Sequence, residues 1–157
     1  MSTVGKGDES NHRLEIAPLA PADHERWNVL ARGYKTFYET TLTDAEYEHT
    51  WQRLLARDGI AGLAARLDGK LVGITHYLFH ASSWSAEACY LQDLFVDASV
   101  RGQGIARALI EGVAAQVRER GAVRLYWSTH QDNTTARTLY DKVAAHRGFI
   151  RYDYPIA

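Results

Sequence analysis

The sequence predicts a mixed α/β protein whose β-sheet is antiparallel in its first half and holds a βαβ unit in its second half. Two apolar runs flank Asp68-Gly69, the dipeptide that most favours a tight hairpin. From residue 88 to residue 129 the pattern alternates strand, loop, helix and strand, the order of a βαβ unit. A chain of 157 residues, 46% of them hydrophobic, is long enough to bury a core. We expect one domain over residues 13–157 after a flexible tail over residues 1–12.

The first half of the chain contains two helical patterns. In Pro21–Glu39 the large apolar residues recur three or four positions apart, which predicts a helix. A second helix is expected to begin after Thr43 and to extend to Asp58-Gly59. Its start is well defined, because Thr43 and Glu46 have the spacing of a capping box.

Strand patterns lie on both sides of these helices. Leu14–Leu19 is expected to form a first strand. Ile60–Leu67 and Leu71–Phe79 are separated by the Asp68-Gly69 turn, so we expect them to pair as antiparallel neighbours.

The second half follows the strand and helix alternation of the βαβ unit. Its expected elements are a strand over Ala88–Val96, a helix over Gly104–Arg120 that Gly121 ends, a strand over Val123–Thr129, a helix over Thr134–Arg147 and a terminal strand over Phe149–Tyr154.

Charge and cysteine content exclude several classes of protein. The chain has 18 basic and 19 acidic residues, so no net field attracts nucleic acid or an anionic membrane. The single cysteine, Cys89, excludes an internal disulfide framework and a cysteine-rich zinc site. The polar start of the chain has no apolar segment typical of a secretory signal, so we expect a cytoplasmic protein.

The segment VRGQGIAR places a pair of glycines at the start of a predicted helix. A dinucleotide-binding fingerprint needs a third glycine where Arg107 stands, and a P-loop needs Lys-Ser or Lys-Thr where Ile105-Ala106 follow. A turn of this kind instead presents unpaired amides and the positive end of a helix dipole, which suits a pyrophosphate. Taken alone, an isolated pair of glycines more often only ends a loop.

Two spaced segments carry a resemblance to a known family. LFVDASVRGQGIARALI resembles the acetyl-CoA-binding segment of the GCN5-related N-acetyltransferase (GNAT) family, whose pattern Arg101, Gly104 and Ala106 match. NTTARTLYDKVAAHRGF is similar to the later helix of the family. The resemblance implies the GNAT fold, a mixed central sheet with helices on both faces. Within the family, YLQDLFV and LYWSTHQDN most resemble the branch that acetylates polyamines, histone tails and small amino compounds.

The resemblance also implies which residues hold acetyl-CoA, the expected cosubstrate. The backbone of Leu94, Phe95 and Val96 would pair with the pantetheine arm, and the glycine turn would hold the pyrophosphate. Asn133 would bond the pantetheine arm, although its position equally suits a helix cap. The residues expected to bind the cosubstrate are Leu94, Phe95, Val96, Arg101, Gly102, Gln103, Gly104, Ile105, Ala106, Arg107, Asn133 and Ala136.

Acetyl transfer to an amine needs proton transfers as well as binding. A free alkylammonium has a pKa of about 10, so it must lose a proton before its nitrogen can attack. The departing sulfur benefits from an acid. By resemblance Tyr140 protonates the thiolate, whereas its place on an apolar helix face alone favours a core tyrosine.

The base is less clearly marked in this sequence. Where the polyamine branch tends to have a glutamate, there is Gln92, which cannot accept a proton, followed by Asp93. On a regular strand these two side chains point to opposite faces, so both reach a substrate only if a bulge distorts the strand. Asp93 then binds the amine directly or through water, or it is a structural hydrogen-bond acceptor.

The segment GYKTFYETTLT connects the first two helices, and in the family this region walls the acceptor site. It supplies four candidate substrate-binding residues, unless the aromatic ones pack into the core: Tyr34, Phe37, Tyr38 and Glu39. If Glu39 and Asp93 both face the acceptor, the preferred substrate should carry a primary amine and a second positive charge, as diamines and polyamines do.

No metal site is expected. His76 and His80 are four residues apart on a strand, but no third residue completes a metal-binding spacing, so both are interpreted as ordinary hydrogen-bonded histidines. Cys89 lies in an apolar strand, so a direct attack is favoured over a covalent relay through its thiol.

Three functions remain open. The first is an N-acetyltransferase that acts on a small-molecule amine, the second a protein-lysine or N-terminal acetyltransferase, and the third a non-catalytic acetyl-CoA sensor. Nine tyrosines, four phenylalanines and four tryptophans, several near the acceptor loop, favour the small molecule. We also expect a homodimer, because the apolar terminal segment FIRYDYPIA would otherwise leave a strand edge exposed.

Overall fold

A computed structural model describes residues 13–157, so the tail predicted over residues 1–12 lies outside the described residues. The chain divides into two compact units, one that ends at Trp127 and one over Ser128–Ala157. Each is described by itself. The single domain expected over residues 13–157 stays a prediction.

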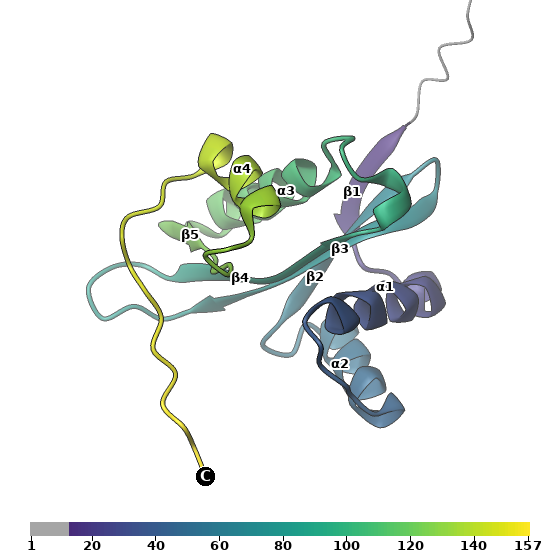
Figure 1. Ribbon diagram of the computed structural model, residues 1–157, viewed down its shortest axis with the longest axis horizontal. Helices are drawn as coiled ribbons and strands as arrows, with labels where there is room; N and C mark the ends of the chain where they lie inside the picture. The colour runs from purple at the N-terminus through teal and green to yellow at the C-terminus, as the bar shows by residue number, and fades with distance from the viewer. Residues whose placement is uncertain (1–12) are drawn as a thin grey trace, which may run out of the picture. The chain divides into compact units, whose positions relative to one another are not determined.

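The first unit contains a sheet of five strands among the described residues, in the order of the sequence (Figure 1). The strands are β1 (Leu14–Pro18), β2 (Ala61–Leu67), β3 (Lys70–His80), β4 (Ala88–Val96) and β5 (Arg124–Tyr126). Strands β1 to β4 pair with one another in antiparallel fashion, and β5 is parallel to β4. This confirms the mixed sheet with a βαβ unit that the sequence predicts.

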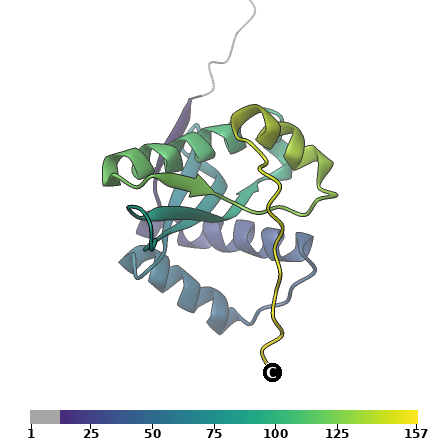
Figure 2. The same ribbon diagram turned by 90° about the vertical axis from the view of Figure 1, so that its left-hand side faces the viewer.

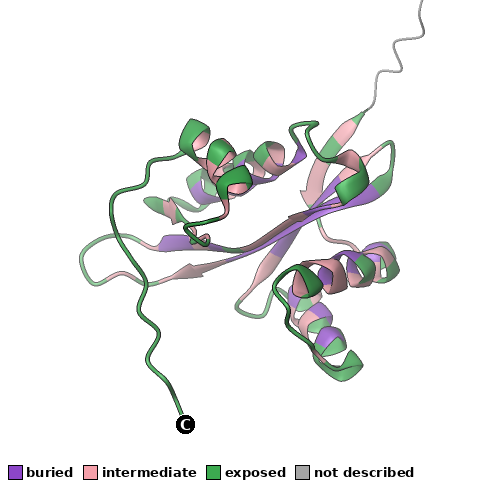
Figure 3. Cartoon of the chain, in the orientation of Figure 1, coloured by how far each residue is buried: buried purple, intermediate pink, exposed green. Residues whose placement is uncertain are grey.

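Helices cover both faces of this sheet (Figure 2). After the short 3₁₀ turn Pro21–Asp23, α1 (His24–Phe37) and α2 (Asp44–Ala56) pack on one face. On the other face lies α3 (Ile105–Arg120), which follows a second 3₁₀ turn. Strands β2 and β3 are therefore buried on both sides, as Figure 3 shows, and this explains their nearly continuous apolar sequence.

Local sequence signals set the element boundaries. Asp68 and Gly69 have φ angles of 52° and 83°, as a two-residue hairpin turn requires. Thr43 Oγ1 accepts a hydrogen bond from the Glu46 amide at 3.2 Å, and the Glu46 carboxylate accepts one from the Thr43 amide at 2.7 Å. The predicted hairpin and capping box are both confirmed.

A β-bulge interrupts the pairing of β3 with β4. His76 lies opposite Asp93, but the next residue, Tyr77, lies opposite Leu91, so Gln92 is the extra residue. Directly opposite residues share a face of the sheet, which places Leu91 with Tyr77 and Asp93 with His76. The bulge therefore turns Asp93 to the face that α1 covers, whereas on a regular strand Asp93 would share the face of Leu91. The distortion that the sequence analysis required is present.

The second unit contains one helix, α4 (Thr134–Val143), and no residue between 128 and 157 is buried. Asn133 caps the helix, since its Oδ1 accepts a hydrogen bond from the Ala136 amide at 3.3 Å. The helix ends four residues before the predicted Arg147.

Two strand predictions need correction. The terminal strand expected over Phe149–Tyr154 is wrong, because residues 144–157 form no strand and no pairing in the structure (Figures 1 and 2). A strand needs a neighbour to bond with, and no described strand pairs with this segment. The strand expected over Val123–Thr129 is shorter, Arg124–Tyr126, because it pairs with β4 only along Ala88–Tyr90.

Candidate functional site

The predicted pyrophosphate turn is formed at the start of α3. Gly102 and Gly104 have φ angles of 81° and 77°, a region that L side chains rarely adopt. A Cβ atom added at either glycine would meet no atom of the described residues within 4 Å, so the space beside the turn is open. The first bond at this end of the helix runs from the Ala108 amide to Gly104 O at 3.0 Å, so the preceding amides of the first turn point outward. These amides and the helix dipole fit a pyrophosphate.

Asp97 fixes the entry to this turn. Its Oδ1 accepts hydrogen bonds from the Ser99 amide at 2.9 Å and the Ser99 hydroxyl at 2.8 Å. Arg26, from α1, pairs with its other oxygen and also donates to Leu71 O at 3.0 Å. The Ser99 hydrogen bonds, assisted by Arg26, lower the pKa of Asp97 to about 2, so the carboxylate is charged at neutral pH. The segment between β4 and α3 is thereby anchored to the first helix.

The second half of β4 has a free edge. β5 pairs only with Ala88–Tyr90, so within residues 13–157 no strand lies beside the residues after Tyr90 on that side. Leu94, Phe95 and Val96, the residues expected to bond the pantetheine arm, lie in this part of the strand. Exposed backbone groups of a strand edge pair with an extended chain, so the geometry fits that role. Val96 O also accepts a bond from Arg101 Nε at 3.2 Å.

Asp93 lies at the bulge, on the side of the sheet that faces α1. Its Oδ2 lies 2.9 Å from Nδ1 of His76. The Tyr34 hydroxyl, from α1, donates a second hydrogen bond to the carboxylate. The side chain of Asp93 is 19% exposed, so an acceptor can reach a largely desolvated carboxylate.

These neighbours decide the charge states of the site. Burial acts to raise the pKa of Asp93, but the hydrogen bonds from His76 and Tyr34 and the charge of Lys35 outweigh it, so the pKa is lowered. Burial and the negative charge of Asp93 raise the pKa of Tyr34. At neutral pH the site therefore contains a carboxylate and a protonated phenol that donates to it.

Aromatic rings surround Tyr34. The ring of Tyr34 lies 4.9 Å from that of Tyr38 and 6.1 Å from that of Phe95, and Phe37 contacts Tyr38 at 5.1 Å. Phe37 and Tyr38 are exposed, so they do not pack into the core. Glu39 is also exposed and has a φ of 54°. The structure thus groups Phe37 and Tyr38 with Tyr34, which is the one of the three that interacts with Asp93. It places no contact between Glu39 and Asp93 among the described residues.

Gln92 and the residues of the second unit have less defined roles. Gln92 is exposed at the bulge. Tyr140 and Ala136 lie on α4, and Asn133 precedes it as the cap. The functional roles implied for Asn133, Ala136 and Tyr140 stay predictions.

Two residues of the site were missed by the sequence analysis: His76, and Trp27 of α1, whose indole Nε1 lies 3.0 Å from Nε2 of His76. His76 was interpreted as an ordinary hydrogen-bonded histidine, yet it contacts the candidate catalytic carboxylate. A signal for it does exist in the sequence: His76 and Asp93 are polar residues in apolar strands, and buried polar groups require partners. His80 instead lies 2.7 Å from the Tyr126 hydroxyl.

Other features lie outside the site. Burial raises the pKa of Cys89 to about 11, so its thiol is protonated at neutral pH. Among residues 13–157, no group of three or more His, Cys, Asp or Glu side chains could hold a metal ion. No helix within the same described range is long and apolar enough to span a bilayer.

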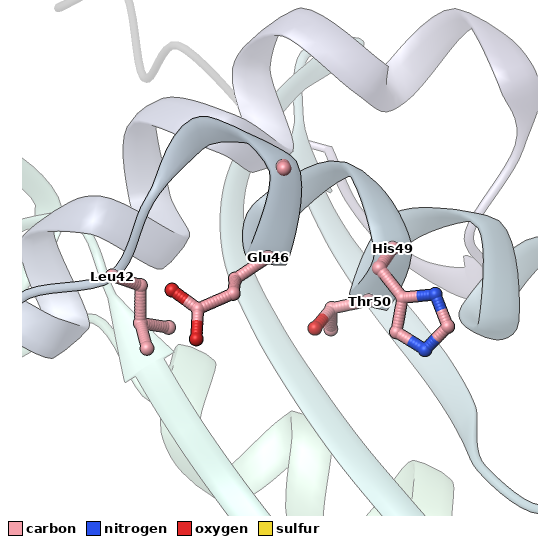
Figure 4. Close-up of a pocket in the computed structure, with 5 residues that line it drawn as sticks. Leu42, Glu46, His49 and Thr50 are labelled. Atoms are coloured by element: carbon pink, nitrogen blue, oxygen red, sulfur yellow. The ribbon is translucent and has the colours of Figure 1, made fainter.

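A shallow pocket of about 400 Å³ lies on α2 (Figure 4). Leu42, Glu46, His49 and Thr50 line it together with Ala45. The Glu46 carboxylate is engaged by the amide and hydroxyl of Thr43, at 2.7 and 2.9 Å. The pocket therefore belongs to the start of α2, and no residue expected to bind acetyl-CoA or the acceptor lines it.

Curated proteins of similar sequence are N-acetyltransferases. A D-amino-acid N-acetyltransferase of Saccharomyces cerevisiae is 34% identical over 138 residues, which cover 85% of this chain and 86% of the relative. A thialysine N-epsilon-acetyltransferase of Caenorhabditis elegans is 30% identical over 130 residues, 83% of this chain and 81% of the relative.

Solved structures agree at the level of the fold. A ribosomal-protein-alanine N-acetyltransferase from Brucella melitensis has a TM-score of 0.75 at 27% identity, with 92% of this chain and 100% of that chain covered. AAC(6')-Iy in complex with a bisubstrate analog of CoA has a TM-score of 0.81 at 19% identity, with 92% and 99% covered, and it supports the fold alone. The sequence pattern of the acetyltransferase (GNAT) family matches residues 27–145. The chain therefore belongs to the GNAT family and is an acetyl-CoA-dependent N-acetyltransferase.

Proposed function

We propose that this enzyme transfers the acetyl group of acetyl-CoA to the primary amine of a small amino compound by direct attack in a ternary complex. The observation that carries the proposal is the carboxylate of Asp93, which is partly exposed at the bulge and interacts with Tyr34, whose ring contacts that of Tyr38. A carboxylate beside aromatic faces suits an ammonium group. The curated relatives named for D-amino acids and thialysine support an acceptor of this size.

Asp93 is suited to accept a proton late in the reaction. An alkylammonium has a pKa about 6 units above that of a carboxyl group, a difference of about 8 kcal/mol, so Asp93 does not deprotonate the resting ammonium. The acceptor loses that proton to water. Once the nitrogen has bonded to the carbonyl carbon it becomes strongly acidic, and Asp93 takes one of its two protons directly or through water, so that the amide product keeps the other.

The rest of the reaction uses the groups that the family resemblance assigns. The new C–N bond forms first and converts the thioester carbonyl to a tetrahedral oxyanion. When this intermediate collapses, the C–S bond breaks and Tyr140 donates its proton to the departing thiolate. Backbone amides of the free β4 edge polarise the thioester carbonyl. The protonated Cys89 thiol is a poor nucleophile, which supports direct attack over a covalent relay.

A thiol-release assay with a panel of amines tests the proposal. The panel contains a D-amino acid, thialysine, spermidine, a lysine-rich peptide and a peptide with N-terminal alanine. We expect the highest kcat/KM for a small amino compound, and a loss of about a hundredfold in Asp93→Asn with unchanged coenzyme A affinity. Spermidine as the best substrate would support the acceptor with two positive charges. Preference for a peptide would indicate a protein acetyltransferase, and coenzyme A binding without turnover would indicate a sensor.

A further inference from the structure

A chain of hydrogen bonds connects helix α1 to the carboxylate at the bulge. The indole Nε1 of Trp27 lies 3.0 Å from Nε2 of His76, and Nδ1 of His76 lies 2.9 Å from Oδ2 of Asp93. Trp27 is 1% exposed and His76 is 8% exposed. The chain is therefore shielded from water until it reaches Asp93.

Donor and acceptor chemistry fixes the proton positions in this chain. An indole N–H can only donate, so Nε2 of His76 must accept with its lone pair. The proton of the neutral imidazole is then on Nδ1, where it is donated to the Asp93 carboxylate. A proton on Nε2 would place two donors against each other in a buried position and leave one of them without an acceptor.

We propose that Trp27 holds His76 in the neutral Nδ1–H tautomer, and that His76 in this form is a positioning residue that orients the Asp93 carboxylate toward the acceptor amine. The catalytic half of the inference rests on the proposed function, whereas the tautomer does not. Because its only lone pair is engaged by Trp27, His76 is not the base of the reaction.

The surrounding groups are consistent with this assignment. Tyr34, on the same helix as Trp27, donates to Asp93, and Lys35 adds positive charge near the carboxylate. Thr75, the neighbour of His76 on β3, donates from Oγ1 to Asp93 O at 2.7 Å and so fixes the backbone of the bulge. An ionised carboxylate has about four lone-pair positions, so the two side-chain donors leave room for an ammonium group.

Nitrogen NMR of the ¹⁵N-labelled enzyme at neutral pH tests the tautomer. We expect the His76 ring to show a protonated Nδ1 and an unprotonated Nε2, with its signals assigned by their loss in His76→Asn. In Trp27→Phe, which removes the indole donor, a protonated Nε2 should appear. A protonated Nε2 in the unmodified enzyme would overturn the inference.

Kinetics of matched variants test the positioning role. An asparagine amide can donate a hydrogen bond from about the place of Nδ1, so His76→Asn should retain most of kcat. His76→Leu has no donor, and its kcat should fall about tenfold to a hundredfold, which is the effect of one hydrogen bond to a charged group. KM for acetyl-CoA should stay unchanged in both. His80→Asn is the control, because His80 lies on the same strand and bonds Tyr126 rather than Asp93.

The outcomes separate the two proposals. Equal kcat in His76→Leu and His76→Asn would overturn the positioning role. A further outcome is an unmodified enzyme that shows the Nδ1–H form of His76 and yet acetylates no amine of the panel. That result would refute the proposed function and the positioning role of His76, but the tautomer would stand.

Discussion

Replacement of Gly104 with valine would test the pyrophosphate turn, and the same helix supplies a control. Gly104 begins α3 with a φ of 77°, and Gly121 ends it with a φ of 75°. A Cβ atom at either position meets no atom of the described residues within 4 Å. Both substitutions therefore cause the same kind of backbone strain without a clash, but only Gly104 lies at the predicted anion site.

The expected effects can be estimated separately for folding and for binding. A side chain in the left-handed region costs about 1–2 kcal/mol. For a domain of this size that lowers Tm by about 2–8 °C in Gly104→Val and in Gly121→Val. At the turn, the loss of one hydrogen bond between a backbone amide and a charged phosphate costs about 1.5–3 kcal/mol, so the Kd for coenzyme A should rise about 10- to 150-fold in Gly104→Val.

Calorimetric titration with coenzyme A and thermal melting of both variants measure these effects. We expect the two melting temperatures to fall together, and the Kd to change in Gly104→Val alone. A folded Gly104→Val variant with the Kd of Gly121→Val would show that the glycine turn does not bind the pyrophosphate.

Four further predictions concern the reaction, the assembly and the core. Because the pKa of Asp93 is lowered, this carboxylate should cause no inflection in the pH profile of kcat/KM between about pH 5 and 8. Over that range kcat/KM should rise as the pH approaches the ammonium pKa of the acceptor. An inflection near neutral pH that does not move when the acceptor is changed would contradict this. Tyr140→Phe should keep coenzyme A binding and lower kcat about a hundredfold, and an unaltered kcat would return Tyr140 to a packing role. Sedimentation at micromolar concentration should give the mass of a homodimer, because the large apolar residues of 149–156 are exposed, and the mass of one chain would exclude it. Arg66→Met should lower the free energy of unfolding in urea by about 3–5 kcal/mol, since it leaves the buried Asp23 carboxylate without its cationic partner, whereas loss of the exposed Arg120–Glu87 pair should have little effect.

Much of the fold is determined by signals that act over a few residues. The Asp68-Gly69 hairpin, the Thr43 and Glu46 capping box and the glycine at the end of α3 all form as predicted. Each depends on the backbone conformations and hydrogen bonds of residues within one turn, so the local sequence is sufficient. The resemblance to the acetyltransferase family was likewise visible in the sequence, in the segment with the glycine turn together with the segment that begins at Asn133.

Pairing between distant residues could not be obtained in this way. The terminal segment has the alternation of a strand, but a strand exists only where another strand accepts its hydrogen bonds, and local propensity does not supply that neighbour. The short length of β5 has the same cause, because β4 pairs with it over three residues only.

The candidate site shows the same division. Asp93 and Tyr34 were recognised as candidates from their residue types and from the family pattern. The hydrogen bond between His76 and Asp93, which are 17 residues apart, depends on the register of β3 with β4 and on the bulge at Gln92. One extra residue in a strand reverses the face of the side chains beyond it, so the tertiary pairing of the strands, and not the sequence of either one, decided that Asp93 meets His76 and Trp27.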